Sequence, residues 1–129
     1  MQGVVTQQLN EARQCSHNKP PILSSGLARR VVEQAVAMAF QVPLREIRAR
    51  TRRRAPIAFA RQVAMYLAHV AYGLTLTEVG VLFARDRTTV AHACGIVEDR
   101  RDDPIFDIFL DHLETSIVRL ANALNTLES

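Results

Sequence analysis

The chain has 129 residues, of which 48% are hydrophobic and 22% are charged, a composition typical of one folded domain with one hydrophobic core. Aromatic residues are only 5% and tryptophan is absent, so the core must be mainly aliphatic, which suits packed helices. Two cysteines far apart in sequence, Cys15 and Cys94, do not indicate a disulfide scaffold. The polar first residues do not form a signal peptide, and no segment is apolar enough to span a membrane. We therefore expect a cytoplasmic protein.

The charges are unevenly distributed along the chain. The formal net charge is only +3, but residues 45–61 contain seven arginines and one acid, whereas residues 98–128 contain eight acids and three arginines. Of the 16 basic residues, only Lys19 is a lysine. A dense basic segment is the footprint expected for a polyanionic partner, and a guanidinium group binds phosphate through two parallel hydrogen bonds more readily than an ammonium group does.

The first predicted elements are a tail and a helix. Residues 1–26 are mixed and polar and end in a double proline and a Ser-Ser-Gly run, so we predict a flexible tail there and a folded domain over residues 27–129. The domain opens with residues 27–40, where apolar side chains at helical spacing predict a helix with one buried face. Met38 belongs to that face and is expected in the core.

A short helix and a basic loop are predicted next. Pro43 fits the first turn of a helix, which Ile47 would anchor while its arginines face outward. Residues 50–56 contain four arginines and no apolar side chain larger than alanine, and their proline blocks a continuous helix. We therefore predict a basic loop over residues 50–56.

Two long helices are predicted in the second half of the chain. Residues 57–72 form the clearest apolar face, and Gly73 is placed to end that helix. Residues 105–124 form a last amphipathic helix after a break at Pro104, with Ile105 and Leu120 on the apolar face. With a helical pair between them and no convincing strand, the pattern predicts an all-α fold, a compact bundle of about six helices.

The pair between these helices has the pattern of a helix-turn-helix. A capping box over residues 75–78 starts a short helix that runs to about Phe83, and Asp86 caps a longer helix that runs to about Arg101. Two helices joined across a turn of about three or four residues present a recognition helix to DNA in many proteins. An ordinary helical hairpin has the same pattern, so the pattern alone does not establish DNA binding.

The start of the second helix carries residues that favour DNA. It reads Arg87-Thr88-Thr89 after Asp86, and a helix N-terminus favours nearby phosphate because its first amides are free and its dipole is positive there. Arginine can pair with a guanine edge, and a threonine methyl group can pack on a thymine methyl group. His92, about one turn further on, is a weaker candidate for a base or phosphate contact.

Three motifs carry a resemblance to a known family. In this order and spacing they resemble the C-terminal DNA-binding domain of the bacterial replication initiator DnaA, over about residues 25–124. The resemblance implies an all-helical fold of that kind, similar also to Trp repressor, and binding of duplex DNA at short asymmetric elements called DnaA boxes. The motifs are residues 60–67 (ARQVAMYL), 76–80 (LTEVG) and 85–94 (RDRTTVAHAC).

The resemblance implies roles for residues of the predicted helical pair. The start of the second helix, residues 86–89, would enter the major groove, and Thr77 of the first helix is a further candidate contact. The family usually has histidine where this chain has Arg87. Because arginine is longer and always charged, the base preference at that step is expected to change.

The resemblance also assigns roles to the basic loop and the helix after it. The arginine aligned with Arg53 enters the adjacent minor groove, and the residues aligned with Arg61 and Gln62 contact the DNA backbone. Narrow A·T tracts concentrate negative potential in the minor groove, which suits a guanidinium group. Phosphate contacts of this kind give an affinity that falls steeply with salt. The other loop arginines are expected to hold phosphates: Arg50, Arg52 and Arg54.

The sequence favours no other chemistry. The four histidines lack the spacing of metal ligands, and Cys94 fits a small core residue of the recognition helix. The acids between Asp102 and Asp111 indicate a solvated acidic face, with no base or nucleophile beside them. There is no catalytic constellation and no Gly-x-x-x-x-Gly-Lys-Ser/Thr loop. We therefore expect that the protein is not an enzyme and binds no nucleotide or other cofactor. We expect the DNA-binding domain of the family without its ATP-binding motor domain.

Two functional hypotheses follow from these patterns. The first is a sequence-specific binder of duplex DNA that recognises DnaA-box-like elements and regulates transcription or replication initiation, as a monomer associated with the nucleoid. The second is a protein-interaction module whose acidic last helix docks on the replication initiator or another regulator. The family resemblance and the arginine at the start of the second helix favour the first.

Overall fold

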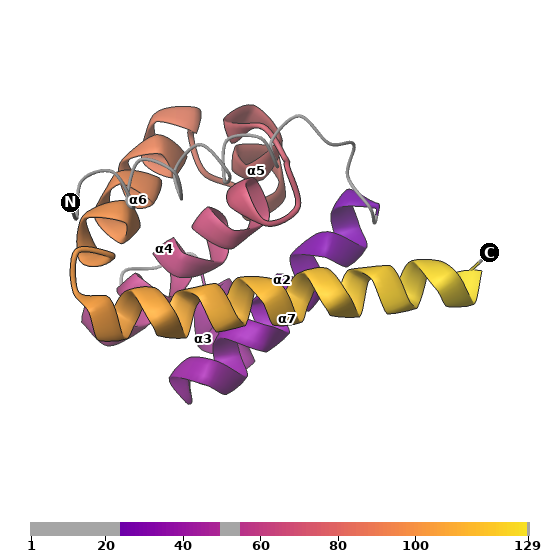
Figure 1. Cartoon of the computed structure of the whole chain (residues 1–129). Coiled ribbons are helices and arrows are strands. Elements are labelled where there is room, and N and C mark those ends of the chain that lie inside the picture. The colour runs from indigo at the N-terminus through magenta and orange to yellow at the C-terminus, as the bar shows by residue number, and fades with distance from the viewer. Residues whose placement is uncertain (1–23, 50–54, 129) are drawn as a thin grey trace.

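The computed structural model describes residues 24–49 and 55–128 of the chain. Within this part the regular structure consists of six helices and no strand, so the predicted all-α bundle is confirmed. The predicted tail, residues 1–26, lies almost entirely outside the described residues. Figure 1 shows α5 and α6 together at the top of the view and α7 lying across α2 below them. The helices are α2 (Ser25–Phe40), α3 (Leu44–Arg48), α4 (Ala55–Val70), α5 (Leu76–Phe83), α6 (Arg87–Arg100) and α7 (Pro104–Glu128).

The central helix of the bundle is α4. It is contacted by α2, α3, α5 and α6, and its residues are buried without interruption from Val63 to Ala68, including the predicted core residue Met65. The helix begins at Ala55, two residues earlier than predicted. This is possible because its proline, Pro56, falls in the first turn, where the missing amide has no helical partner to lose.

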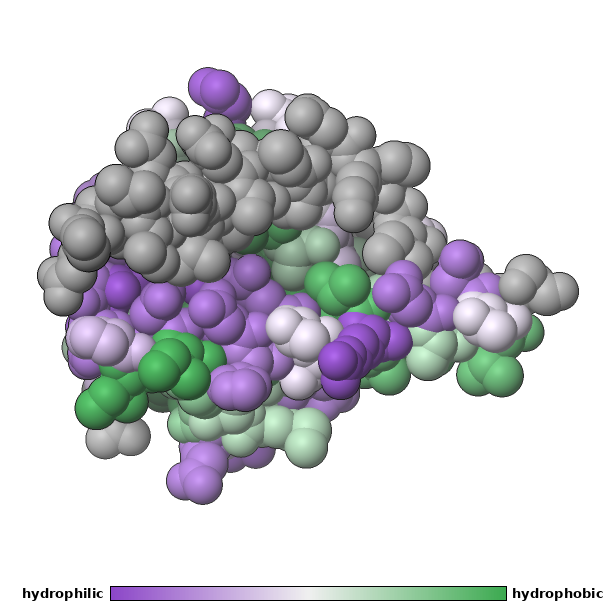
Figure 2. Space-filling view, viewed as in Figure 1, coloured by the Kyte–Doolittle hydropathy of each residue, from purple (hydrophilic) through white to green (hydrophobic). Residues whose placement is uncertain are grey.

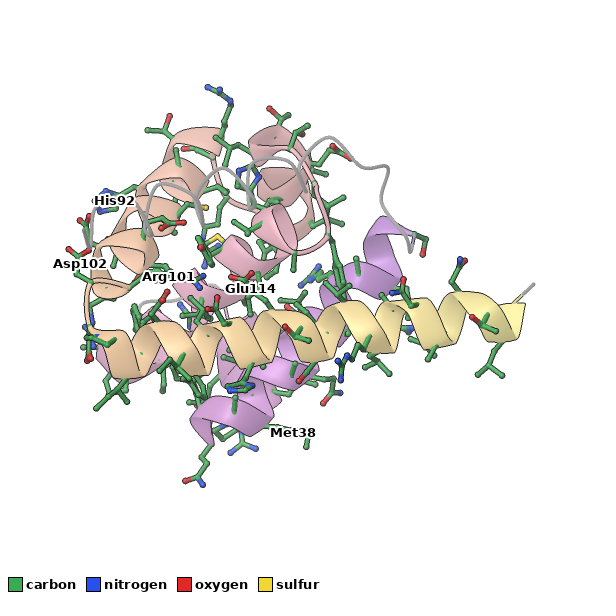
Figure 3. The ribbon with its side chains drawn as sticks, viewed as in Figure 1. Met38, His92, Arg101, Asp102 and Glu114 are labelled. Atoms are coloured by element: carbon green, nitrogen blue, oxygen red, sulfur yellow. The ribbon has the colours of Figure 1, made fainter. Side chains whose placement is uncertain are left out.

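The buried face of α2 is rotated from the predicted one. Val32 and Val36 are fully buried, whereas Met38 is 77% exposed and points away from the bundle (Figure 3). The prediction that Met38 fills the core was wrong because α2 carries apolar side chains on more than one side. Helical spacing alone does not select the side that packs on α4. Glu33, adjacent to Val32, is buried with it.

The longest helix, α7, also packs through an unexpected side. Leu110, Ile117 and Ala121 face inward, while Ile105 and Leu120, predicted for the apolar face, are 80% and 46% exposed. Figure 2 shows the resulting apolar patch over the start of this helix. No helix of the described ranges, α7 included, has the length and apolar character needed to cross a membrane.

An arginine at the end of α6 fastens α7 to the bundle. The side chain of Arg101 is 3% exposed and forms ion pairs with Asp107, Asp111 and Glu114 of α7. Arg101 and Glu114 are labelled in Figure 3. It also donates to the hydroxyl oxygen of Tyr66 on α4 at 3.0 Å. The prediction that Asp107 and Asp111 belong to a freely solvated acidic face is therefore corrected, because a buried guanidinium group attracts both carboxylates inward.

Candidate nucleic-acid interface

The predicted helix-turn-helix is present as α5, a tight turn and α6. The capping box forms as expected, because Thr75 Oγ1 accepts from the Glu78 amide and the Glu78 carboxylate accepts from the Thr75 amide, each at 3.1 Å. The chain turns at Ala84, whose backbone is left-handed with φ 53°. The Arg85 amide then donates to the Gly80 carbonyl oxygen at 2.8 Å and closes the turn.

Gly80 allows this close approach of the two helices. A Cβ atom at position 80 would lie 2.6 Å from the backbone oxygen of Arg85, which is too close for the backbone to stay in place. The orientation in which α6 leaves the turn therefore depends on glycine at this position.

The inner face of α6 is the predicted one. Val90, Ala93 and Val97 are buried, and Cys94 is half-buried against the same core. Burial, together with the nearby Glu98 carboxylate, raises the pKa of the Cys94 thiol to about 11. The thiol therefore stays protonated near neutral pH and acts as a small packing group.

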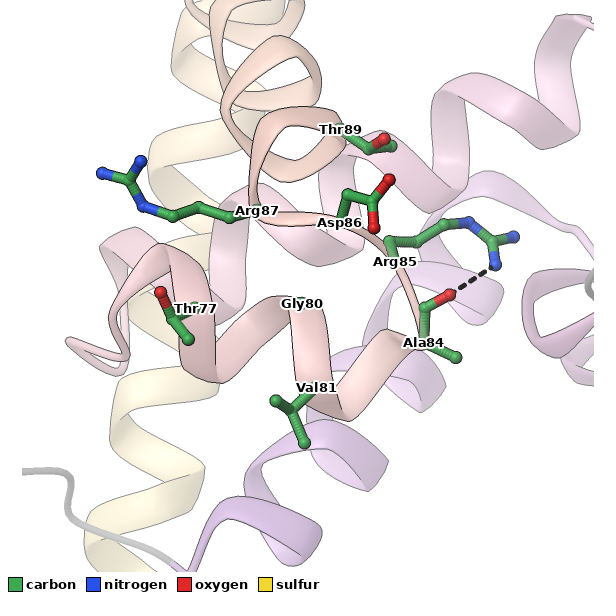
Figure 4. A pocket seen from close by; sticks show the side chains of 8 residues that line it. All are labelled: Thr77, Gly80, Val81, Ala84, Arg85, Asp86, Arg87 and Thr89. Carbon is green, nitrogen blue, oxygen red and sulfur yellow. Dashed lines mark hydrogen bonds between the residues drawn. The ribbon is translucent and has the colours of Figure 1, made fainter.

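The opposite face of α6 is open to solvent at its start. Arg87, Thr88, Thr89 and His92 are exposed, and among the described residues no hydrogen bond or ion pair occupies their side chains. Figure 4 shows the Arg87 guanidinium group standing clear of the ribbon. Thr77 of α5 is exposed as well, and together with Arg87 and Thr89 it lines an open groove of about 520 Å³ between the two helices.

Asp86 occupies the N-cap position of α6, but its side chain does not cap the helix. The residue is exposed and its carboxylate makes no hydrogen bond to the first helical amides, so the predicted cap is corrected. The carboxylate and the first amides of α6 are therefore left to solvent, where a ligand can reach both. In Figure 4 the carboxylate lies on the side of the turn where Arg85 and Thr89 are drawn.

The basic segment begins beside this turn. Arg48 and Ala49, which directly precede the predicted loop, line a small depression together with Arg85 of the turn. Arg61 of α4 lines it too, and its Nε and Nη2 atoms donate to the Glu46 carbonyl oxygen at 3.2 and 3.0 Å. Its neighbour, Gln62, is half-buried. The four loop arginines predicted to contact DNA lie outside the described residues: Arg50, Arg52, Arg53 and Arg54.

Two residues that sequence reasoning did not single out organise this depression. Glu33 is 1% exposed and accepts from Nε of Arg48 at 2.9 Å and from Nε of Arg29 at 3.2 Å. The Arg29 guanidinium group also lies over the ring of Phe83, 5.7 Å from its centre. The only signal in the sequence is the four-residue spacing of Arg29 and Glu33 on one helix. We call this set, Arg29, Glu33, Arg48, Arg61 and Arg85, the arginine depression.

In the part of the chain that the structure describes, the histidines and acids away from this interface do not form a metal site. Within residues 24–49 and 55–128, no group of three or more His, Cys, Asp or Glu side chains is arranged to hold a metal ion. His69 is engaged through a 2.6 Å contact between its Nδ1 atom and the Leu74 carbonyl oxygen. The α7 acids Asp107, Asp111 and Glu114 form ion pairs with Arg101.

Comparison with known proteins assigns this helical pair to a family. Residues 30–97, more than half of the chain, match the family described as the bacterial DnaA protein helix-turn-helix. The chain is 35% identical over 96 residues to the chromosomal replication initiator protein DnaA of Symbiobacterium thermophilum, and 41% identical over 78 residues to that of Acinetobacter baumannii. The matches cover 73% and 59% of this chain but only 21% and 17% of those initiators. The expectation that the chain is not an enzyme agrees with this family, which is a DNA-binding module and not a catalytic one.

Proposed function

The chain belongs to the bacterial DnaA helix-turn-helix family, and on that premise we propose that it binds duplex DNA in a sequence-specific way at DnaA-box-like elements. The observation that carries the proposal is the exposed start of α6, residues 87–89, beside a depression lined by arginines. These two features lie on either side of one short turn, so one curved cationic surface can contact a double helix.

In the proposed complex the start of α6 enters the major groove. Arg87 is long enough to donate two hydrogen bonds to one guanine edge, and the methyl groups of Thr88 and Thr89 can pack on thymine methyl groups. The exposed Asp86 carboxylate can accept from a cytosine amino group. Thr77 and His92 stand at the margins of this surface, where phosphate contacts are expected.

The basic segment supplies the second half of the proposed contact. Arg53 enters the adjacent minor groove, while Arg61 and Gln62 face the DNA backbone. Arg61 is held by the Glu46 carbonyl oxygen through two of its nitrogens, so it would approach a phosphate in a fixed orientation. The other loop arginines, Arg50, Arg52 and Arg54, hold phosphates and make the affinity depend on salt.

The proposed role is regulation of transcription or of replication initiation in the cytoplasm, by a monomer that occupies elements the initiator also recognises. The competing hypothesis, docking on the replication initiator through an acidic last helix, has less support. Its acids Asp107 and Glu114 are only 22% and 16% exposed and are engaged by Arg101. Two of the acids that this hypothesis needs are therefore turned toward the bundle, while the third partner of Arg101, Asp111, keeps 47% of its side chain exposed.

An equilibrium binding titration tests the proposed function. The full chain is titrated into a labelled duplex that contains a DnaA box and into a scrambled duplex, at two salt concentrations. We expect a preference for the box, and Arg87→Ala is expected to weaken box binding by about 1–3 kcal/mol and to relax the preference. Arg119→Ala, which removes the same charge from an exposed position of α7, is the matched control and should leave the preference intact.

The outcomes of that titration separate the hypotheses. Equal binding of both duplexes would reduce the function to generic DNA binding, and no binding to either would favour the docking module. Selection of bound sequences from a random duplex pool then identifies the element. If Arg87→Ala leaves both affinity and preference unchanged, direct reading of bases by α6 is wrong.

A further inference from the structure

The arginine depression is built from four separate elements around one buried acid. Its lining includes Arg29 of α2, Arg48 of α3, Arg61 of α4 and Arg85 of the turn before α6, and Glu33 is the only acid among the described residues that line it. The fold therefore brings guanidinium groups from distant parts of the sequence to one place. Four like charges so close together repel one another unless an anion joins them.

Glu33 holds two of these guanidinium groups by their Nε atoms. One carboxylate oxygen accepts from Arg48 at 2.9 Å, and the other accepts from Arg29 at 3.2 Å. Among the described residues, no acceptor is hydrogen-bonded to the Nη atoms of either arginine. A guanidinium group has five N–H donors, so the bond to Glu33 fixes each group and leaves its terminal donors for another acceptor.

The exposure of these side chains matches that division. Glu33 is 1% exposed, whereas the side chains of Arg29 and Arg48 are 36% and 43% exposed. The carboxylate is thus buried, while part of each arginine side chain reaches the surface. On the neighbouring turn, Arg85 donates to the Ala84 carbonyl oxygen at 3.1 Å, so its guanidinium group is also oriented by the protein.

We propose that the arginine depression binds one phosphodiester group of the DNA backbone, and that Glu33 positions the arginines for it. This inference rests on the proposed DNA binding. Arg85 directly precedes the start of α6, so the phosphate bound here belongs to a strand that borders the major groove entered by α6. A phosphate contact carries no base information, but it fixes the position of the recognition helix along the duplex.

Removal of one guanidinium group tests the phosphate site. Arg48→Gln and the control Arg119→Gln remove the same charge, the first from the depression and the second from α7. Each variant is titrated into box and scrambled duplexes over a series of salt concentrations. We expect Arg48→Gln to weaken both duplexes by a similar factor, about tenfold, and to lower the slope of log affinity against log salt by about one. Arg119→Gln should leave both values near those of the wild type.

Substitution of the buried acid tests the positioning role. If Glu33 were only an unfavourable negative charge near DNA, Glu33→Gln would raise the affinity. We expect it to lower the affinity, although the protein becomes more positive, because an amide holds the two arginines less firmly. Circular dichroism and thermal unfolding establish that the variant is folded. If it is not folded, Arg48→Lys is used instead. An ammonium group keeps the positive charge, so the salt slope should stay at the wild-type value. It cannot bind Glu33 and a phosphate with separate N–H groups held in one plane, so the affinity should be reduced.

Each result supports or overturns a stated part. If the wild-type chain binds no duplex, the proposed function fails and this site fails with it. If the wild type binds but Arg48→Gln behaves as Arg119→Gln, only the phosphate site is overturned. If folded Glu33→Gln binds as tightly as the wild type or more tightly, or if Arg48→Lys has full affinity, the positioning role of Glu33 is overturned.

Discussion

Glu33 and Arg101 are the two charged side chains buried in the described part of the molecule, and they carry opposite charges. Glu33 binds two arginines beside the helix-turn-helix. Arg101, which follows the other end of α6, binds three carboxylates of α7. At each place one buried charge gathers several charges of the opposite sign that remain partly exposed, so one end of the molecule is left with a positive excess and the other with a negative one.

The difference between the two clusters separates a stabilising role from a binding role. Arg101 connects α4, α6 and α7 through Tyr66 and the α7 acids, so it is part of the architecture. Glu33 binds two arginine side chains that keep a third or more of their surface exposed, so it orients guanidinium groups toward a ligand in solution. A polyanion is attracted to the first end of α6 and repelled from the other, which orients the encounter.

The largest effect is expected when the Arg101 cluster is broken. Arg101→Met removes a buried guanidinium group and leaves three carboxylates facing one another. Loss of one partner from a buried ion cluster costs about 3–5 kcal/mol, and we expect the lower end because the side chain of Asp111 is 47% exposed. Urea unfolding followed by circular dichroism measures the change, and the DNA affinity of the folded variant should stay unchanged.

The adjacent arginine is the matched control. Arg100 is exposed and lies over the ring of Phe59, 4.8 Å from its centre, so Arg100→Met should cost less than about 1 kcal/mol. Equal destabilisation by both substitutions would show that burial does not distinguish the two clusters as we infer.

The second largest effect is expected at the turn. A methyl group at Gly80 would press on the backbone oxygen of Arg85, which cannot move without displacing α6. Gly80→Ala should therefore cost about 2 kcal/mol of stability and also weaken DNA binding. Gly95→Ala is the control, because nothing lies within 4 Å of its added Cβ and helix propensity should make it stabilising by about 0.5–1 kcal/mol. A neutral Gly80→Ala would show that the turn adjusts freely.

These residues also show which features could be predicted from the sequence. The helix-turn-helix was predictable because its signals are local, a capping box at Thr75 and apolar residues such as Val90 and Val97 on one face of α6. The buried faces of α2 and α7 were not, because Met38 and Ile105 satisfy helical spacing as well as the residues that are buried. Packing against other helices decides between such faces, and a single segment does not contain that information.

The two charged clusters could not be predicted from the sequence for the same reason. Glu33 and Arg48 are 15 residues apart, and Arg101 and Glu114 are 13 apart, so no local pattern connects them. The uneven charge along the chain predicted a basic middle and an acidic end of the sequence. It did not predict that Arg101, inside the acidic segment, is the residue that holds that segment in place.

A smaller effect is expected at the start of α5. Thr75→Ala removes the hydroxyl oxygen that accepts from the Glu78 amide, and loss of such a cap costs about 1 kcal/mol. Thermal or urea unfolding measures it, and DNA affinity should not change, because Thr75 precedes the groove residues. Thr77→Ala is the control for stability and should stay within about 0.5 kcal/mol, since Thr77 is exposed and does not cap the helix. If the two variants unfold alike, the capping box contributes nothing measurable.

The smallest effect should have the opposite sign, at the other end of the same helix. Ala84 adopts φ 53°, a left-handed conformation in which a Cβ atom is strained and glycine is not. Ala84→Gly should therefore stabilise the protein by less than about 1 kcal/mol, because relief of that strain exceeds the greater freedom of glycine in the unfolded chain. Ala91→Gly, at an exposed interior position of α6, should instead destabilise by about 1 kcal/mol. If the two alanine-to-glycine substitutions change the free energy of unfolding in opposite directions, the positive end of the molecule can be stabilised without change to the residues that face DNA. If both change it in the same direction, the turn has a different backbone conformation.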